Sequence, residues 1–177
     1  MLSSVRKKTE NKNGVTIRDA TERDLPGILQ ITNEIILSST AIYEDDPTTL
    51  EALMETYRQR NGAGYPYFVA EHIGRIIGFC TYGPFRARVG YRTSVENSLH
   101  VTAGQRGKGV GNAMLTHLIE HAKRRGFHMM IAGIDATNEH SIYLHEKHGF
   151  VVTARMPEVA RKFDKWLELV LMQRKLV

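Results

Sequence analysis

A glycine-rich segment at residues 105–111, QRGKGVG, has the composition of a phosphate-binding loop. Its three glycines allow the backbone to approach a ligand closely, and its arginine and lysine add positive charge. The segment precedes a stretch with helical spacing, and the start of a helix presents unpaired N–H groups at the positive end of the helix dipole. We therefore expect this segment to bind a phosphate group; a flexible turn before a helix is the less specific alternative.

The two common nucleotide-binding motifs do not match this segment. Residues 107–112 read GKGVGN, which is not GxGxxG, and the lysine is not followed by Ser or Thr as in GxxxxGK[ST]. The phosphate ligand is therefore expected to differ from those of dinucleotide-binding and P-loop proteins.

Further polar residues lie on both sides of this segment. Glu96 interrupts a strand of otherwise apolar and small residues, and burial in a cleft would raise its pKa and make it a proton acceptor. The alternative is a glutamate that points outward from the strand. Asn138, Ser141 and His145 are spaced i, i+3 and i+7, so they share one helical stripe, and a polar stripe here suits a ligand. The alternative for His145 is an exposed helix histidine.

The hydrophobic spacing predicts the elements that position these residues. We expect helices at 25–36, 47–60 (capped by Thr48 and Glu51), 109–125 and 137–148. Strands are expected at 15–20, at 67–83 as a hairpin that turns at Ile73 and Gly74, and at 94–101, 129–134 and 166–173. This order predicts a mixed α/β domain, with one partly parallel sheet and helices on both faces.

Several segments resemble one family of transferases. Gln105-Arg106-x-x-Gly109-x-Gly111 resembles the [QR]-x-x-G-x-[GA] motif with which GNAT acetyltransferases bind the pyrophosphate of acetyl-coenzyme A (acetyl-CoA), and SIYLHEKHGF (141–150) resembles their final helix and its Gly-Phe. PFRARVGYRTSVENSLHV (84–101) and RKFDKWLELVLMQ (161–173) resemble the phosphinothricin and methionine-sulfone acetyltransferase branch. The resemblance, which runs from about residue 15 to 173, implies a GNAT fold with a mostly antiparallel, twisted mixed sheet as a single domain over 15–177.

The resemblance also implies roles for particular residues. Glu96 would be the general base, and His145 would act at the leaving thiolate, where the wider family has a tyrosine; Tyr143 ranks below it for this role. The remaining residues expected to contact acetyl-CoA are Leu99, His100, Val101, Gln105, Arg106, Gly107, Lys108, Gly109, Val110, Gly111, Asn112, Asn138 and Ser141. The acceptor amine would attack the thioester directly in a ternary complex, so no covalent enzyme intermediate is expected, and Cys80 is expected in the core.

The acceptor in the resembling branch is the α-amine of a small amino-acid analogue, whose carboxylate requires a cation. Arg86 or Arg88 is the candidate for that cation, and Tyr43 is expected to line the acceptor pocket. The alternatives are solvated arginines and a core tyrosine. A protein or peptide N-acetyltransferase of the same fold is the competing function, and an acyl-CoA sensor without turnover is disfavoured because both Glu96 and His145 are present.

Composition limits the remaining possibilities. The chain has 177 residues, is 42% hydrophobic and 24% charged, and carries a formal charge of +5, of which residues 1–14 supply most. This segment is expected to be a disordered basic tail, and the dispersed aromatic residues disfavour a nucleic-acid partner. We expect no metal, no membrane span, a cytoplasmic location consistent with the single cysteine, and a homodimer, as the apolar last strand and the branch suggest.

Overall fold

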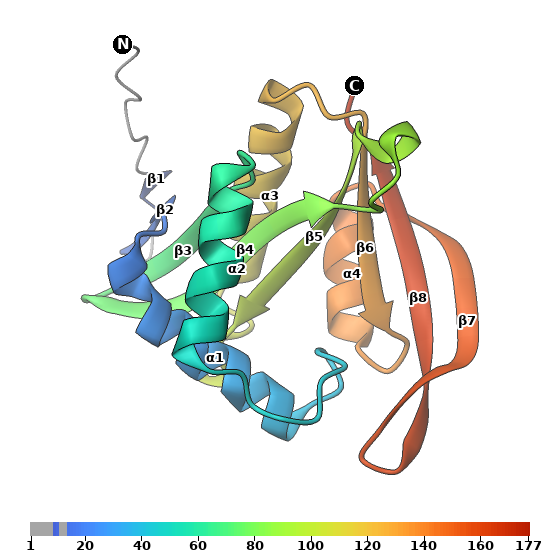
Figure 1. Ribbon diagram of the computed structural model, residues 1–177, viewed down its shortest axis with the longest axis horizontal. Coiled ribbons are helices and arrows are strands. Elements are labelled where there is room, and N and C mark those ends of the chain that lie inside the picture. The colour runs from blue at the N-terminus through green and yellow to red at the C-terminus, as the bar shows by residue number, and fades with distance from the viewer. Residues whose placement is uncertain (1–8, 11–13) are drawn as a thin grey trace.

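The computed structural model describes Thr9, Glu10 and residues 14–177. Most of the segment expected to be a basic tail therefore lies outside the described residues, and Thr9–Glu10 within it form a short strand that pairs with the next one. The strands form a single sheet in the order β1-β2-β3-β4-β5-β6-β8-β7 (Figure 1). Within the described part of the chain, no helix is long and apolar enough to cross a membrane.

The described residues form four α-helices and eight strands, most of which the spacing of apolar residues predicts. The strands are β1 (Thr9–Glu10), β2 (Val15–Asp19), β3 (Tyr67–His72), β4 (Arg75–Pro84), β5 (Ser94–Val101), β6 (Met129–Asp135), β7 (Val151–Lys162) and β8 (Lys165–Lys175). The α-helices are α1 (Leu25–Ser38), α2 (Leu50–Gly62), α3 (Val110–Arg124) and α4 (Glu139–Lys147), and short 3-10 turns are η1 (Glu22–Asp24), η2 (Val89–Tyr91) and η3 (Ala103–Gln105).

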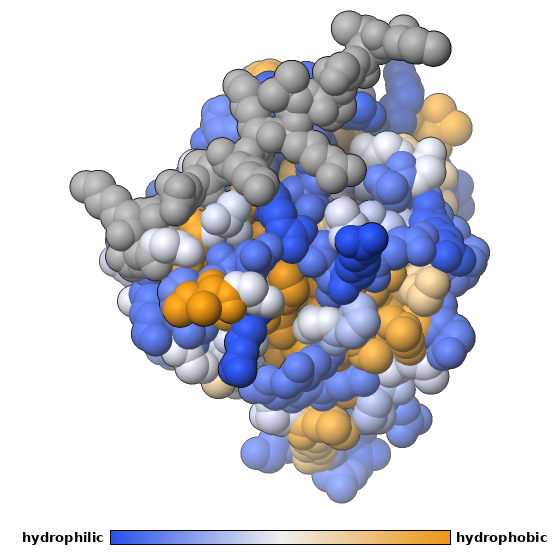
Figure 2. Space-filling view, turned by 90° about the vertical axis from the view of Figure 1, so that its left-hand side faces the viewer, coloured by the Kyte–Doolittle hydropathy of each residue, from blue (hydrophilic) through white to orange (hydrophobic). Residues whose placement is uncertain are grey.

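The helices cover the two faces of the sheet and bury a separate core on each. One core joins α3 to the sheet through buried side chains such as Met114, Leu115 and Leu118, and side chains of α4 pack against it. The other core joins α1 and α2 to the opposite face, with Ile28 and Ile31 at its centre. This confirms the predicted mixed sheet with helices on both faces. On the side of the molecule shown in Figure 2, hydrophilic side chains predominate and hydrophobic ones form small separate patches.

Two local predictions have different outcomes. The hairpin of β3 and β4 turns at Ile73 and Gly74, whose φ angles of 49° and 70° are those of a tight hairpin turn, so this prediction is confirmed. The predicted cap of α2 is wrong by one residue, because Thr49 is the N-cap and its side chain accepts a hydrogen bond from Ala52 N at 3.2 Å. Thr48 instead exchanges two hydrogen bonds with the side chain of Asn33 on α1.

Strand β7, at the edge of the sheet, was not expected from the sequence. Most of its side chains are exposed, so it lacks the alternation of buried and exposed residues by which a half-buried strand is recognised. Its pairing with β8 also shifts register twice, once between Met156 and Ala160, where Glu158 has a φ of 53°. Because of these irregularities, hydrophobic periodicity alone does not predict this strand of 12 residues.

The central strands β5 and β6 separate along their length, and this separation forms the site. They pair in parallel only at Ser94, Val95 and Glu96, whose partners are residues 129–131. Farther along, β5 stays paired with β4 as far as Val101, while β6 stays paired with β8 as far as Asp135. The two strands diverge in Figure 1, so the sheet opens at its centre. The short parallel pairing confirms the prediction that part of the sheet is parallel.

Candidate active site

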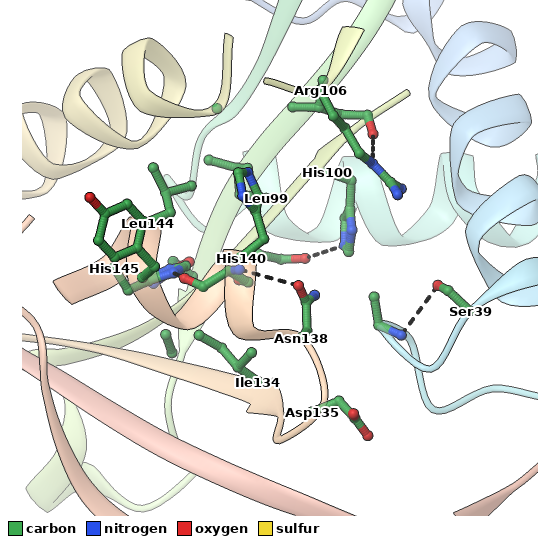
Figure 3. A pocket seen from close by; sticks show the side chains of 18 of the residues that line it. Ser39, Leu99, His100, Arg106, Ile134, Asp135, Asn138, His140, Leu144 and His145 are labelled. Carbon is green, nitrogen blue, oxygen red and sulfur yellow. Dashed lines mark hydrogen bonds between the residues drawn. The ribbon is translucent and has the colours of Figure 1, made fainter. Parts of the chain in front are cut away.

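A cavity of about 780 Å³ lies where β5 and β6 separate (Figure 3). Side chains from the end of α1 and the loop after it, from β5, from the start of α3, from β6 and from α4 line it. The expected acetyl-CoA and thiolate residues that line it are Leu99, His100, Val101, Arg106, Gly107, Gly109, Gly111, Asn112, Asn138, Ser141, Tyr143 and His145. The structure thus brings together three segments that are far apart in the sequence.

The cavity is lined from both faces of the sheet. Alternate residues of β5 point to opposite faces, and Val95 and Leu99 belong to the core beneath α3. His100 instead contacts Phe79 in the core beneath α1 and α2, with ring centres 5.2 Å apart. Because both Leu99 and His100 line the cavity, ligand groups in the opening are accessible from both sides of the sheet.

The glycine-rich segment forms the turn into α3. Gly107 and Gly109 have φ angles of 74° and 81°, which residues with a Cβ rarely adopt, so glycine is strongly favoured at these positions. Gly109 is the N-cap of α3, and Arg106 donates a hydrogen bond from Nε to Val101 O at 3.2 Å, which ties the turn to the end of β5. The free N–H groups at the start of α3 therefore adjoin the cavity, an arrangement that suits an anionic ligand.

Three residues of this segment lie on a second, smaller hollow. Gln105, Lys108 and Val110 line a space of about 330 Å³ together with Val15 and His72. Lys108 Nζ donates to Gln105 Oε1 at 3.4 Å, so these two side chains interact beside the turn. The expected contacts of the segment thus divide between the main cavity and this hollow.

His145 is buried at the wall of the cavity, with 3% of its surface exposed, so it is not an exposed helix histidine. Its Nδ1 lies 2.8 Å from Ser141 O, which can only accept, so Nδ1 carries the proton. Its Nε2 lies 3.3 Å from the side-chain oxygen of Asn97. Burial lowers the pKa of His145 to about 4, so the ring is neutral at pH 7 and Nε2 is unprotonated.

Asn97 is a site residue that the sequence analysis missed. Its Nδ2 donates to Ile131 O of β6 at 3.0 Å, at the point where the two strands stop pairing, and this bond turns Oδ1 toward His145. The amide therefore links β5 to β6, and its Oδ1 lies against His145 of α4, whose Nε2 can donate to it only when the ring is protonated. The sequence did carry a signal for it, because Asn97 is a polar residue between Val95 and Leu99 on the side of β5 that faces the core.

Glu96 lies on the other face of the sheet, half-buried beside the cavity rather than in its lining. Its carboxylate packs against Gly133, which does line the cavity, and a Cβ at Gly133 would lie 3.1 Å from Glu96 Oε1. Burial raises the pKa of Glu96, and the positive charges of Arg86 and Arg60 partly oppose that rise. A half-buried carboxylate with a raised pKa has the properties of a general base.

Tyr43 reaches the cavity through a contact with Asp135. Its hydroxyl donates to Asp135 Oδ2 at 3.3 Å, and Asp135 is buried in the cavity lining at the end of β6. Burial, followed by the charge of Asp135, raises the pKa of Tyr43 to about 12, so the phenol stays protonated. Asp135 also accepts from Thr137 N at 2.9 Å; the sequence analysis did not single it out, although an acidic residue directly after an apolar strand was a usable signal.

The remaining predicted residues take clear positions. Asn138 is the N-cap of α4, and its side chain accepts from Ser141 N at 3.2 Å. Arg86 and Arg88 are exposed on the segment after β4, where Arg86 stacks on Phe85. Cys80 is fully buried, and burial raises the pKa of its thiol, so it has the properties of a core residue. Among Thr9, Glu10 and residues 14–177, no cluster of three or more His, Cys, Asp or Glu side chains is placed to hold a metal.

Two curated proteins are similar to almost the whole chain. The L-methionine sulfoximine/L-methionine sulfone acetyltransferase of Pseudomonas paraeruginosa is 42% identical over 159 residues, which cover 89% of this chain and 92% of that protein. A phosphinothricin N-acetyltransferase of Alcaligenes faecalis is 33% identical over 162 residues, which cover 91% of this chain and 82% of that protein.

Solved structures agree with these similarities. The structure of yncA, a putative acetyltransferase from Salmonella typhimurium with its cofactor acetyl-CoA, superposes with a TM-score of 0.90 at 40% identity and covers 93% of this chain and 95% of that one. A ribosomal-protein-alanine N-acetyltransferase from Brucella melitensis superposes with a TM-score of 0.88 at 42% identity, covering 90% and 98%. The acetyltransferase (GNAT) family model matches residues 29–150. With the opened sheet and the glycine turn at α3, these similarities show that the chain belongs to the GNAT family of acetyltransferases.

Proposed function

We propose that this protein is an N-acetyltransferase that transfers the acetyl group of acetyl-CoA to the α-amine of a small amino-acid-like acceptor. The observation that carries the proposal is the cavity between β5 and β6, which ends at the start of α3 and is bordered by Glu96 on one face and His145 on the other. The similarity to methionine sulfoximine/sulfone and phosphinothricin acetyltransferases supports the acceptor class.

The residues of the cavity fit acetyl-CoA. Its pyrophosphate would lie at the start of α3, where the Gly107 and Gly109 turn exposes N–H groups and Arg106 supplies positive charge. Its pantetheine arm would enter the opening beside Leu99 to Val101, where β5 has no strand partner on the β6 side. Backbone N–H groups freed there would hydrogen-bond the arm and polarise the thioester carbonyl.

Chemistry in this arrangement proceeds by direct attack. Glu96 takes a proton from the ammonium group of the acceptor, directly or through a water molecule, and the free amine attacks the thioester. His145 approaches from the opposite face and is assigned to the leaving sulfur. Because its Nε2 is unprotonated, it can donate to the departing thiolate only after it takes up the second proton, which the attacking nitrogen loses as the C–N bond forms and the C–S bond breaks. Tyr143, also in the cavity lining and 57% exposed, remains the second candidate.

The acceptor is assigned to the side of the cavity where Glu96 and Tyr43 lie. Arg86 influences Glu96 electrostatically, so a carboxylate held by Arg86 or Arg88 would place the neighbouring α-amine near the base. The Tyr43 hydroxyl, bonded to Asp135, would form the wall of that pocket. The alternative is a protein N-acetyltransferase, which the similarity to the ribosomal-protein-alanine enzyme favours.

A thiol-release assay separates these functions. The purified protein is given acetyl-CoA with methionine sulfone, methionine sulfoximine, phosphinothricin, a polyamine, or a peptide with an N-terminal alanine. The proposal expects turnover with the amino-acid analogues and loss of that turnover in Arg86→Met or Arg88→Met, with the exposed Arg92→Met variant as the matched control. Turnover with the peptide alone would establish the alternative instead.

We further propose a cytoplasmic homodimer that uses the edge formed by β7 and β8. This edge carries exposed hydrophobic side chains, which are Val151, Val152, Met156, Val159, Phe163 and Trp166. An edge strand with exposed apolar residues readily pairs with another chain. Size-exclusion chromatography coupled to light scattering should give the mass of a dimer, and Trp166→Lys should shift that mass toward a monomer. A wild-type monomer at micromolar concentration would contradict this part.

A further inference from the structure

Lys162, the last residue of β7, is buried, which is unusual for a lysine. Only 2% of its surface is exposed, and its ammonium group donates to three backbone carbonyls. Nζ lies 2.7 Å from Ile36 O, 2.9 Å from Ser39 O and 2.7 Å from Ile42 O. All three donors of the ammonium group are therefore used, and all three acceptors belong to the end of α1 and the loop that follows it.

The groups that surround the ammonium of Lys162 are hydrogen-bond acceptors and negative charges. The carbonyls at the end of α1 lack partners within the helix and lie at the negative end of its dipole. Burial lowers the pKa of Lys162, and the carboxylates of Asp45 and Glu44, on the same loop, partly oppose that shift. A neutral side chain of similar length cannot satisfy three carbonyls at once.

The loop held by Lys162 leads directly to the cavity. Ser39 and Ala41 line the cavity, and Ser39 faces it in Figure 3. Ile42, whose carbonyl Lys162 binds, immediately precedes Tyr43, whose hydroxyl bonds to Asp135. The loop is therefore attached on one side to the β7–β8 hairpin and on the other to the end of β6.

We propose that Lys162 is a positioning residue for the acceptor pocket: it holds the 39–43 loop from the β7–β8 hairpin so that Tyr43 meets Asp135 beside Glu96. The proposal rests on the proposed function, in which Tyr43 borders the acceptor. Lys162 itself lies behind the loop and is assigned no contact with either substrate. Substitution of Lys162 should therefore affect use of the acceptor more strongly than use of acetyl-CoA, which is held mainly at α3 and β5.

The test compares Lys162→Met with Lys165→Met, the exposed lysine that pairs with Lys162 across the hairpin. Lys162→Met should raise the KM for the amino-acid acceptor about 10- to 100-fold and leave the KM for acetyl-CoA nearly unchanged. Hydrogen exchange measured by mass spectrometry, without any substrate, should become faster in residues 39–43 and stay unchanged in α3. Lys165→Met should behave like the wild type in both measurements.

Lys162→Gln keeps two donors on a shorter side chain and replaces Lys162→Met if that variant does not fold. It should raise the KM for the acceptor and the exchange rate of residues 39–43 by smaller amounts. In the Lys162→Gln/Tyr43→Phe double variant, the losses should be less than additive, because both changes act on one loop. Unchanged exchange in residues 39–43, or an equal loss for both substrates, would overturn the positioning role. Failure of the proposed function would be distinguishable, because the wild-type protein would then turn over no amino-acid acceptor. The hydrogen-exchange measurement needs no substrate, so it would still test the positioning role.

Discussion

Replacement of Glu96 by glutamine is the most direct test of the chemistry. Glutamine has nearly the same shape, so Glu96→Gln keeps the packing against Gly133 and removes only the ability to accept a proton. Loss of a positioned general base typically lowers the rate about 10²- to 10⁴-fold, which corresponds to about 3–5 kcal/mol of transition-state stabilisation. We expect a fall in kcat/KM of that size, with the KM for acetyl-CoA nearly unchanged.

The pH dependence of activity tests how nearby charges set the pKa of Glu96. Below its pKa, Glu96 is protonated and cannot accept a proton, so activity falls as the pH falls. Burial places that pKa above the ordinary value of 4.5, and Arg86 and Arg60 pull it down. Arg60→Met removes one of these positive charges, so it should move the acid limb of the profile to higher pH. Arg92→Met, on the exposed turn after η2, is the matched control and should leave the limb in place.

The measurement is kcat/KM for the best amino-acid acceptor between pH 5 and 9, followed by release of the coenzyme thiol, for the wild type and each variant. The Glu96→Gln profile should lack the acid limb. Full activity of Glu96→Gln at pH 7 would refute the role of Glu96 as base. A limb that Arg60→Met moves to lower pH would refute the electrostatic explanation even if Glu96 proves essential.

Three further predictions concern the walls of the cavity. Gly133→Ala should lower kcat roughly tenfold by displacing the Glu96 carboxylate, with little change in melting temperature; wild-type kcat would contradict the contact. Gly109→Ala forces a Cβ into a left-handed conformation at a cost of about 1–2 kcal/mol, so the KM for acetyl-CoA should rise, as steady-state kinetics would reveal. Asn97→Asp places a negative charge at Nε2 of His145, so NMR titration should show the pKa of His145 rising from about 4, and an unchanged value would disprove their contact.

Features set by nearby residues could be read from the sequence. The turn at Gly107 and Gly109, the helix α3 after it and the tight turn at Gly74 depend on neighbours a few residues away. Their composition and spacing therefore predicted them, although α2 begins three residues and α3 one residue later than expected. Strand β7 escaped because its exposed side chains carry no periodic pattern.

The sequence by itself determined the family, the order of most elements and the glycine-rich turn before α3, because each depends on short stretches of chain. Only the tertiary structure decided how these parts meet. Asn97 lies against His145, Tyr43 bonds to Asp135, and Lys162 reaches Ile36 across 126 positions of the chain. Such contacts depend on the separation of β5 from β6 and on the packing of the β7–β8 hairpin against the end of α1. Contacts between residues far apart in the chain leave no periodic signal in a single sequence.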